Sequence, residues 1–429
     1  MDTDRPAVTE LTADVATAVA RQVVAVCADV FEAILREMPE LRDDKSALAV
    51  LDSSVHGNVD TCLQILLHRI DVADVHVPTA AAEYARRLAQ RGTPLAALLR
   101  TYRLGHARFS DWLLSELARQ TDNAELISAT ALNMSRIVAR YIDLTSESMV
   151  AAYDQESLNW ARKRSAARAA RIRDLISGER VDASEAEATL GYRLRQNHAG
   201  LVCWVDTAAG AADEITRLER AIGRVARQAG CPGEPLFLPR DESSAWAWLP
   251  LGVRGAFDPA AASRAQVESG LRFAFGDAAN GATGFRLTHQ QAIAAEAVAL
   301  AAGTAAPRVV AFGEVAPVAM MLRSEELLRA WVLSALADLA TDDEDHARLR
   351  DTLLVFLQSG GSYKTTAEQL TLHRNTVQYR IRKAEEGLGR PVGEKRQDVE
   401  LALRASRWLG SYVLQPPAAG GSHDDSRAS

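Results

Sequence analysis

The sequence predicts a protein of three domains: an all-α N-terminal domain, an α/β middle domain and an all-α C-terminal domain that contains a helix-turn-helix. Three observations lead to this prediction. Apolar residues keep a helical spacing from about Leu11 to Leu144, the spacing changes to that of strands after Gly178 and Gly191, and helical spacing returns from about Ala319. The length of 429 residues also suits about three domains.

The composition narrows the classes of function. Apolar residues make up 48% and charged residues 24%, as in a soluble protein with real cores. The net charge of -7 argues against a chain that coats nucleic acid or a membrane along its whole length, so any DNA-binding surface must be local. We see no secretory signal and no membrane-length apolar run, so we expect a cytoplasmic protein without membrane contact.

The cysteines and histidines predict no metal site and no cofactor. The four cysteines form no C-x-x-C pair and have no histidine cluster beside them, so neither a disulfide framework nor a zinc site is indicated. Four histidines of the N-terminal region lack the spacing of metal or haem ligands, and we expect structural or surface roles for them. They are His56, His68, His76 and His106.

The N-terminal helical domain is expected over residues 1–145. Its clearest helix boundary is Gly92-Thr93-Pro94. Gly92 suits the left-handed end of one helix, Thr93 the cap of the next, and Pro94 the first turn, where its missing N–H costs nothing. The helix that follows carries one apolar face.

A connector helix is expected over residues 146–180. Two interpretations of it stay open, a solvated connector and a helix that pairs in parallel with a second copy, because a possible heptad seam has apolar residues at only seven of eleven positions. Its centre, Arg162-Lys163-Arg164, is basic. The seam positions are Tyr141, Leu144, Ser148, Ala151, Gln155, Leu158, Arg162, Ser165, Ala169, Ile172 and Ile176.

The α/β domain is expected over residues 190–316. The order of elements is close to β-α-β-β-α-β with one further α-β step, the layout of ferredoxin-like and nucleotidyl-cyclase palm folds. Strands are expected at 201–205, 236–238, 245–249, 271–275 and 309–312, and helices at 213–229, 259–269 and 288–301.

The C-terminal domain is expected over residues 318–412. Helices should run from about Ala319 to Leu409, with a solvated turn at the four acidic residues 342–345. The glycine and the ligand spacing of a calcium-binding loop are missing from that acidic run. We expect residues 413–429 to form a disordered tail, since they are rich in Pro, Gly, Ser and Asp from Pro416 onward.

A helix-turn-helix is predicted within residues 362–383. A short helix ending at Leu370, a three-residue turn and a second helix starting near Arg374 would bury one set of apolar residues together, and a small alanine permits close crossing of the two helices. Thr371 lies where such turns often carry glycine. The expected core residues are Ala367, Leu370, Leu372, Val377 and Ile381.

The outward face of the second helix is the predicted DNA-binding surface. Residues 373–383 hold four Arg or Lys and no acid, and residues 360–407 carry a net charge of +4 against -11 for the rest of the chain. Cations neutralise phosphates, and Asn and Arg side chains hydrogen-bond base edges. We expect phosphate contacts from His373 and Arg374, base contacts from Asn375, Thr376, Tyr379 and Arg382, and backbone contacts from Arg380 and Lys383, with Gln378 on the same helix.

From Leu349 to Leu409 the sequence resembles the C-terminal helix-turn-helix domain of PucR-type bacterial transcriptional regulators. The resemblance is carried by Thr352-Leu353, residues 366–370, residues 373–381, Gly389 and residues 401–403. Residues 90–95 with 100–105 are similar to the N-terminal sensor domain of RsbR-like proteins, and the α/β region resembles the degenerate GGDEF-like domain of PucR and CdaR regulators. The resemblance implies a homodimer that binds promoter DNA and senses a signal, such as an unidentified small-molecule effector.

Other functions were weighed against this one. Active palm-type cyclases carry a glycine-rich acidic hairpin, whereas the tip here is Arg240-Asp241-Glu242-Ser243-Ser244, so we expect no enzyme activity. Gly360 to Thr365 lacks the glycine before its lysine that a phosphate-binding loop needs, and a helix boundary is expected there. A stress-signalling interaction protein remains the alternative.

Overall fold

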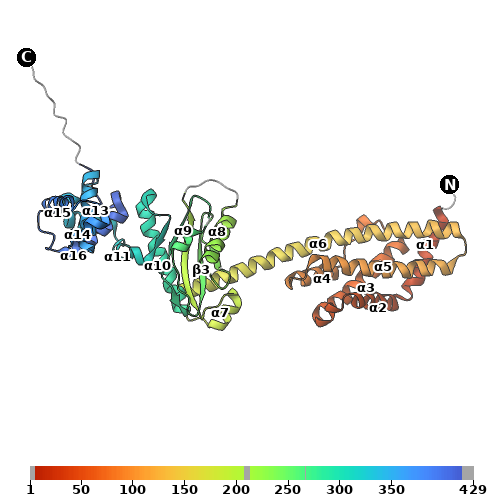
Figure 1. Cartoon of the computed structure of the whole chain (residues 1–429). Helices are drawn as coiled ribbons and strands as arrows, with labels where there is room; N and C mark the ends of the chain where they lie inside the picture. The colour runs from red at the N-terminus through yellow and green to blue at the C-terminus, as the bar shows by residue number, and fades with distance from the viewer. Residues whose placement is uncertain (1–4, 207–212, 266, 418–429) are drawn as a thin grey trace, which may run out of the picture. The chain divides into compact units, whose positions relative to one another are not determined.

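The computed structural model describes residues 5–206, 213–265 and 267–417 (Figure 1). It divides into two compact units, Met1–Ala167 and Arg168–Ser429. No helix in the described ranges is both long and apolar enough to cross a membrane. Of the tail expected from residue 413, residues 418–429 lie outside the described ranges.

The first unit is all-α, as predicted. In its core, α3 packs against α1, α2 and α4, and α5 packs against α1 and α2. The helices are α1 (Arg5–Ala20), α2 (Val23–Glu37), α3 (Lys45–His68), α4 (Thr79–Gln90), α5 (Leu95–Gln120) and the first part of α6 (Ala124–Ser177), with 3-10 turns η1 (Pro39–Asp43) and η2 (Val72–Asp74).

The boundary between α4 and α5 lies where the sequence places it, with one correction. Gly92 adopts a left-handed φ of 70° after α4. The residue that caps α5 is Pro94 rather than Thr93, and it makes no side-chain cap. Thr93 instead accepts a hydrogen bond at its carbonyl from the Tyr153 hydroxyl at 2.6 Å, which ties this turn to α6.

Helix α6 contributes to the cores of both units. Met134, Val138, Tyr141 and Met149 are buried in the first unit, and Ile172 is fully buried in the second. Residues 160–167 between these two groups are exposed. The expected heptad seam is therefore not one continuous exposed stripe, because residues at its two ends are packed in the cores of the two units. Its positions at 151, 155, 158, 162 and 165 are exposed.

The second unit begins with an α/β domain built on a mixed sheet. The strand order is β2-β3-β1-β4-β6, with β5 paired to β1, and β4 and β6 run parallel. Its elements are α7 (Ala183–Leu190), β1 (Asn197–Val205), α8 (Glu214–Gln228), β2 (Leu236–Pro239), β3 (Ser244–Gly252), α9 (Ala260–Arg264), β4 (Leu271–Phe275), β5 (Ala279–Asn280), α10 (Gly281–Ala302), η3 (Gly303–Ala305) and β6 (Val309–Ala311).

Alternating residues of the central strand bury both faces of this sheet. Leu201 and Cys203 of β1 lie in the core that contains α8, whereas Val202 lies in the core that contains α10. Gly200 allows α10 to approach β1, because a Cβ there would lie 2.9 Å from the backbone of His289. The sheet is thus covered on two sides, which agrees with the expected α/β sandwich.

Two helix predictions in this domain were wrong in extent. The helix expected at 259–269 is only the five residues of α9, because the backbone is already extended at Ala265. The helix expected from Thr288 begins seven residues earlier, at Gly281, directly after β5. An alanine-rich pattern contains few large apolar residues, so it fixes helix ends poorly.

The C-terminal part of the second unit is all-α. The helices begin earlier than the expected Ala319, at Phe312, although Pro317 lies inside the first of them. The elements are α11 (Phe312–Met321), α12 (Glu325–Leu336), η4 (Ala337–Ala340), α13 (Glu344–Gln358), α14 (Tyr363–Leu370), α15 (Arg374–Leu388), α16 (Arg396–Leu409) and η5 (Gly410–Tyr412).

The acidic run and the start of the tail have structural roles. Asp343 caps α13 by accepting the His346 backbone N–H at 2.8 Å, so the acidic run starts a helix. Residues 413–415 are not a disordered tail: Val413 and Leu414 are buried, and the Gln415 N–H donates to the Ala340 carbonyl at 3.0 Å. Two buried apolar side chains and this backbone pairing hold the segment in place.

Candidate nucleic-acid interface

The stretch between α13 and α14 is a helix boundary, as predicted. Gly360 and Gly361 have φ values of 68° and 85°, and the Gly361 N–H donates to the Phe356 carbonyl at 2.9 Å, which ends α13. Ser362 then caps α14 by accepting the Thr365 N–H at 3.2 Å. These backbone and hydroxyl groups are used to end and start helices, not to form a phosphate loop.

The turn between α14 and α15 has the three residues that the sequence predicts. Thr371 takes the left-handed conformation (φ 52°, ψ 45°), where glycine would be unstrained. The Leu372 N–H donates to the Ala367 carbonyl at 2.9 Å and closes the turn. His373 caps α15, its ring Nδ1 accepting the Asn375 N–H at 3.2 Å. The chain thus keeps helix-turn-helix geometry at the cost of one strained threonine.

The inward face of the motif is apolar. Ala367, Val377 and Ile381 are buried, whereas Leu370 and Leu372, also expected in the core, are half-buried at the rim of the turn. Thr366, whose hydroxyl donates to the Ser362 carbonyl, is buried although it was not expected in the core, and Ala384, which helical spacing places on the inward side of α15, is buried as well. Buried Val377 and Ile381 fix the rotation of α15 about its axis.

That rotation decides which side chains of α15 face outward. Two of the nine residues expected to contact DNA, Thr376 and Arg380, are half-buried, and the other seven are exposed. The exposed ones are His373, Arg374, Asn375, Gln378, Tyr379, Arg382 and Lys383. We call these seven exposed residues the α15 outer face. By helical spacing Asn375, Tyr379, Arg382 and Lys383 lie opposite Val377, whereas His373 and Arg374 lie at the start of the helix.

Arg380 differs from its expected placement. Its guanidinium donates to the Thr352 hydroxyl of α13 at 3.2 Å, so part of its hydrogen-bonding capacity braces α15 against α13. The contact of Thr352 with Arg380 was not predicted, because the two residues lie 28 positions apart in the sequence.

The remaining basic side chains of the outer face differ in their partners. Lys383 lies 2.6 Å from a Glu386 carboxylate oxygen, and this hydrogen bond raises the pKa of Lys383. Arg382 lies over the Tyr379 ring, 5.9 Å from its centre. Within the described ranges, Arg374 and Arg382 form no ion pair, so their charges stay available at the surface.

The β2–β3 hairpin tip is the second place where the sequence suggested chemistry. Arg240 lies 2.8 Å from Glu296 of α10, whose side chain is buried. Burial alone would raise the pKa of Asp241, but hydrogen bonds from Ser244 and Ser243 lower it to about 2. The charged groups of the tip, Arg240 and Asp241, are thus held by neighbouring residues of the same domain.

Three family models match the chain, one for each expected domain. Residues 10–168 match the RsbT co-antagonist protein rsbRD N-terminal domain, residues 174–298 match the GGDEF-like domain, and residues 349–405 match the PucR C-terminal helix-turn-helix domain. Together with the helix-turn-helix geometry, these matches give the chain the domain make-up of a transcriptional regulator. The chain carries the domain set of a PucR-type regulator, as the sequence motifs indicate.

The chain is also similar to parts of curated proteins. It is 36% identical over 95 residues to "Purine catabolism regulatory protein" of Bacillus subtilis, covering 22% of this chain and 18% of that protein. It is 36% identical over 76 residues to "Transcriptional activator PmfR" of Paenarthrobacter nicotinovorans, covering 18% of this chain and 16% of that one. The chain spans 55% of a third relative, an uncharacterised protein of Thermomonospora curvata, at 35% identity over 100 residues, which is 23% of this chain.

The chain is also similar to a solved structure, the regulator of polyketide synthase expression from Bifidobacterium adolescentis. The sequence identity is 17%, and the match covers 56% of this chain and 95% of that chain. The TM-score is 0.28.

Proposed function

We propose that this regulator binds promoter DNA through the α15 outer face. The observation that carries the proposal is that exposed Asn375, Tyr379 and Arg382 lie on one side of a helix whose other side is fixed by buried Val377 and Ile381. Such a helix fits the major groove, where arginine and asparagine hydrogen-bond base edges. Lys383 and Arg380 add positive charge near the phosphates, and the positive end of the α15 dipole at His373 favours a phosphate there.

The regulator acts as a homodimer in this proposal. A two-fold dimer presents two recognition helices to half-sites about 34 to 36 Å apart. The exposed part of the α6 seam, from Ala151 to Ser165, offers one pairing surface, with Leu158 55% exposed at its centre. Ile172, once expected on the same surface, is buried in its own unit and takes no part. A Leu158→Glu variant should therefore lose dimer mass by light scattering, whereas Ala167→Glu, an exposed position of α6 outside the seam, should keep it.

The upstream domains act as sensors rather than enzymes in this proposal. The hairpin tip supports this, because Arg240 and Asp241 already have partners within the domain. The regulator works where bacterial DNA lies, in the cytoplasm. Incubating the full chain with GTP or ATP and Mg²⁺ should give no cyclic nucleotide; formation of one would contradict the assignment.

The proposal is tested by selecting bound duplexes from a random library with the full chain. We expect enrichment of two related half-sites, and we expect Asn375→Ala and Arg382→Ala to relax the sequence preference at particular base positions. Glu394→Ala, a change remote from the α15 outer face in sequence, serves as a control and should leave the preference unchanged. Failure to enrich any sequence, with strong capture of a protein partner, would favour the interaction-protein alternative.

A further inference from the structure

The C-terminal part of the second unit contains a cleft between α13 and α16, with a volume of about 450 Å³. Arg350 and Leu354 of α13 and Leu403 and Arg407 of α16 lie in its walls, and Leu370 at the end of α14 lies there too. We call this space the α13–α16 cleft. Ligand pockets of proteins enclose roughly 300 to 1,000 Å³, so the cleft has room for a small organic molecule.

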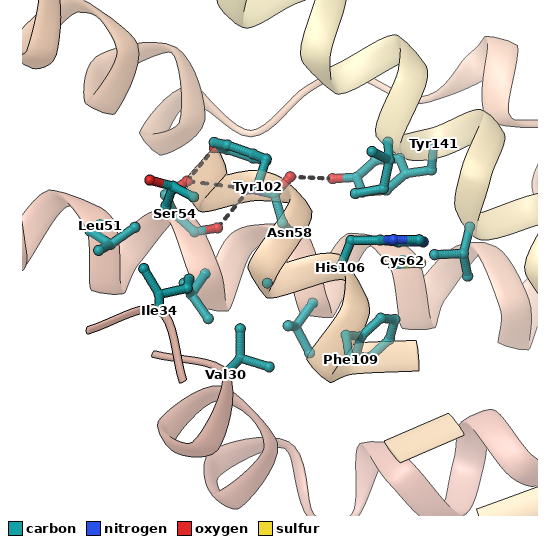
Figure 2. Close-up of a pocket in the computed structure, with 16 residues that line it drawn as sticks. Val30, Ile34, Leu51, Ser54, Asn58, Cys62, Tyr102, His106, Phe109 and Tyr141 are labelled. Atoms are coloured by element: carbon teal, nitrogen blue, oxygen red, sulfur yellow. Dashed lines mark hydrogen bonds between the residues drawn. The ribbon is translucent and has the colours of Figure 1, made fainter. Parts of the chain in front are cut away.

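The cavity of the first unit that Figure 2 shows is much smaller, with a volume of about 60 Å³. Its polar side chains bind one another: the hydroxyls of Ser54 and Tyr102 share a hydrogen bond at 2.7 Å, and the Tyr141 hydroxyl donates to the Asn58 side chain at 2.9 Å. Such a space holds a few water molecules at most. A small-molecule site is therefore better sought in the α13–α16 cleft.

The wall of the α13–α16 cleft contains a buried cation, Arg350, which is only 7% exposed. Its Nη1 donates to the Leu339 and Thr341 carbonyls at 2.7 and 2.5 Å. In the part of the chain that the structure describes, these two carbonyl oxygens bind the guanidinium, and it forms no ion pair. A buried charge without an opposite charge beside it is costly, and a guanidinium has five N–H donors, so Arg350 is suited to a bound carboxylate.

Burial lowers the pKa of Arg350, and the charges of three nearby aspartates, among them Asp342 and Asp351, act in the opposite direction. Asp342, Asp351 and Arg407 also line the cleft, and all three are exposed. The lining therefore carries two positive and two negative side chains. A simple anion would meet two carboxylates and a simple cation two guanidinium groups, whereas a molecule with one charge of each sign can pair with both.

The rest of the lining is mainly apolar. Leu354 and Leu403 are buried, and Leu370 is half-buried. The hydroxyl of Ser406, also in the lining, donates to the Leu403 carbonyl at 2.9 Å, and its oxygen can still accept a hydrogen bond from an N–H group. The cleft thus combines paired charges with an apolar wall.

We propose that the α13–α16 cleft binds a free amino acid that has an apolar side chain. Its carboxylate pairs with the two arginines of the lining, since guanidinium and carboxylate groups form strong charge-assisted hydrogen bonds. Its ammonium group pairs with the two aspartates, and its side chain packs against Leu354, Leu370 and Leu403.

The cleft is connected directly to the helix-turn-helix. Leu370 is the last residue of α14, and Thr371 begins the turn that leads to α15. Helix α13, which forms one wall, packs against both α14 and α15. A molecule in the cleft therefore contacts the first helix of the motif. That the amino acid changes DNA binding rests on the proposed function, whereas the existence of the site does not.

The site is tested by calorimetry and thermal unfolding of the full chain with L-leucine and L-phenylalanine. We expect saturable binding of at least one of them and a rise in melting temperature, since a ligand that binds only the folded state stabilises it. Analogues that lack one charged group should bind about tenfold or more weakly. The analogues without the ammonium group are 4-methylpentanoate and 3-phenylpropanoate, and those without the carboxylate are 3-methylbutylamine and 2-phenylethylamine.

Two pairs of variants assign the binding to the cleft. Arg407→Gln should weaken amino acid binding by about tenfold and leave the amine analogues unaffected, because they have no carboxylate. Arg404→Gln, on the same helix but outside the lining, is its control. Asp351→Asn should likewise weaken amino acid binding and leave the carboxylate analogues unaffected, with Asp345→Asn of α13 as its control. Arg407 and Asp351 are exposed, so neither change should prevent folding.

The absence of saturable binding by both amino acids would overturn the proposed site, as would equal binding to the wild type, Arg407→Gln and Asp351→Asn. Equally tight binding of an analogue with a single charge would overturn the zwitterionic ligand class. DNA binding is measured independently of these probes. A chain that binds the amino acid but selects no duplex would refute the proposed function and leave the cleft site standing.

Discussion

The α15 outer face and the β2–β3 hairpin tip are both short, charged motifs, but they use their charges in opposite ways. The hairpin directs Arg240 to the buried Glu296 and holds Asp241 by two serines. The outer face leaves Arg374 and Arg382 at the surface without an acidic partner within the described ranges. A binding surface needs charges that a partner can reach, whereas the charges of the hairpin contribute to its own fold.

This difference separates two kinds of mutational effect. Loss of a charge from the hairpin should lower the free energy of unfolding, because it leaves a buried charge without its partner. Loss of a charge from the outer face should leave that free energy almost unchanged and weaken DNA binding.

Arg240→Ala should lower the free energy of unfolding of the second unit by about 2 to 4 kcal/mol, since it leaves the Glu296 carboxylate buried without its partner. Urea unfolding of the full chain, followed through the fluorescence of Trp246 and Trp248, measures this change. The double variant Arg240→Ala with Glu296→Gln should recover part of the loss. An effect below about 0.5 kcal/mol would show that the hairpin charges are no more structural than ordinary surface residues.

The ring of His289 packs against the ring of Trp246 in the hairpin, with 4.7 Å between the ring centres. We expect His289 to make the second unit sensitive to acid. Burial and then the charge of Arg240 lower the pKa of His289 to about 4. As the pH falls below 6.5, the unfolded chain binds this proton and the folded chain does not until about pH 4. The contribution of His289 to the free energy of unfolding is therefore fully present above pH 6.5. It falls by about 3 kcal/mol as the pH drops from 6.5 to 4.

The variant His289→Phe isolates this contribution, since phenylalanine keeps an aromatic ring and has no proton to bind. The pH dependence of unfolding between 6.5 and 4 should flatten relative to the wild type. Burial also lowers the pKa of His198, so some slope should remain in the variant. Identical slopes in the two proteins would mean that His289 is protonated in the folded state.

Arg382→Ala should weaken binding to the selected duplex by about 1 to 3 kcal/mol if the side chain hydrogen-bonds a base. Its free energy of unfolding should change by less than about 0.5 kcal/mol, since Arg382 is exposed and forms no ion pair within the described ranges. Fluorescence anisotropy and urea unfolding on the same preparation give both numbers. Equal weakening on all sequences would reduce Arg382 to a phosphate contact.

Thr371→Gly should stabilise the turn by about 0.5 to 1 kcal/mol, because glycine relieves the left-handed strain but is more flexible in the unfolded chain. Thermal unfolding measures the gain. DNA affinity should not change, as Thr371 precedes the outer face. A destabilised variant would show that the threonine side chain contributes more to the turn than its backbone strain costs.

The local geometry of the helix-turn-helix could be predicted from the sequence because adjacent residues set it. Ala367, Val377 and Ile381 alternate with charged residues at helical spacing, and this pattern fixes the helix bounds and the inward face. The strand pairing β2–β3 followed from two apolar runs flanking a polar turn. In both cases the deciding interactions lie within about 20 residues of one another.

Interactions between distant residues could not be predicted in this way. The contact of Arg380 with Thr352 depends on how α13 crosses α15, and the Arg240–Glu296 pair joins residues 56 positions apart. The α13–α16 cleft has the same origin, since its lining residues are spread between Asp342 and Leu414. No spacing of Arg350 along the chain indicates that its guanidinium lies in such a space.

The salt dependence of duplex binding tests the role of the α15 outer face most directly. We expect the full chain to bind duplex DNA with an affinity that falls steeply as salt rises, and we expect Arg374→Ala to reduce the slope of log K against log salt concentration by about one. An affinity for DNA that does not depend on salt, or a slope that Arg374→Ala leaves unchanged, would contradict the assignment of this face to DNA.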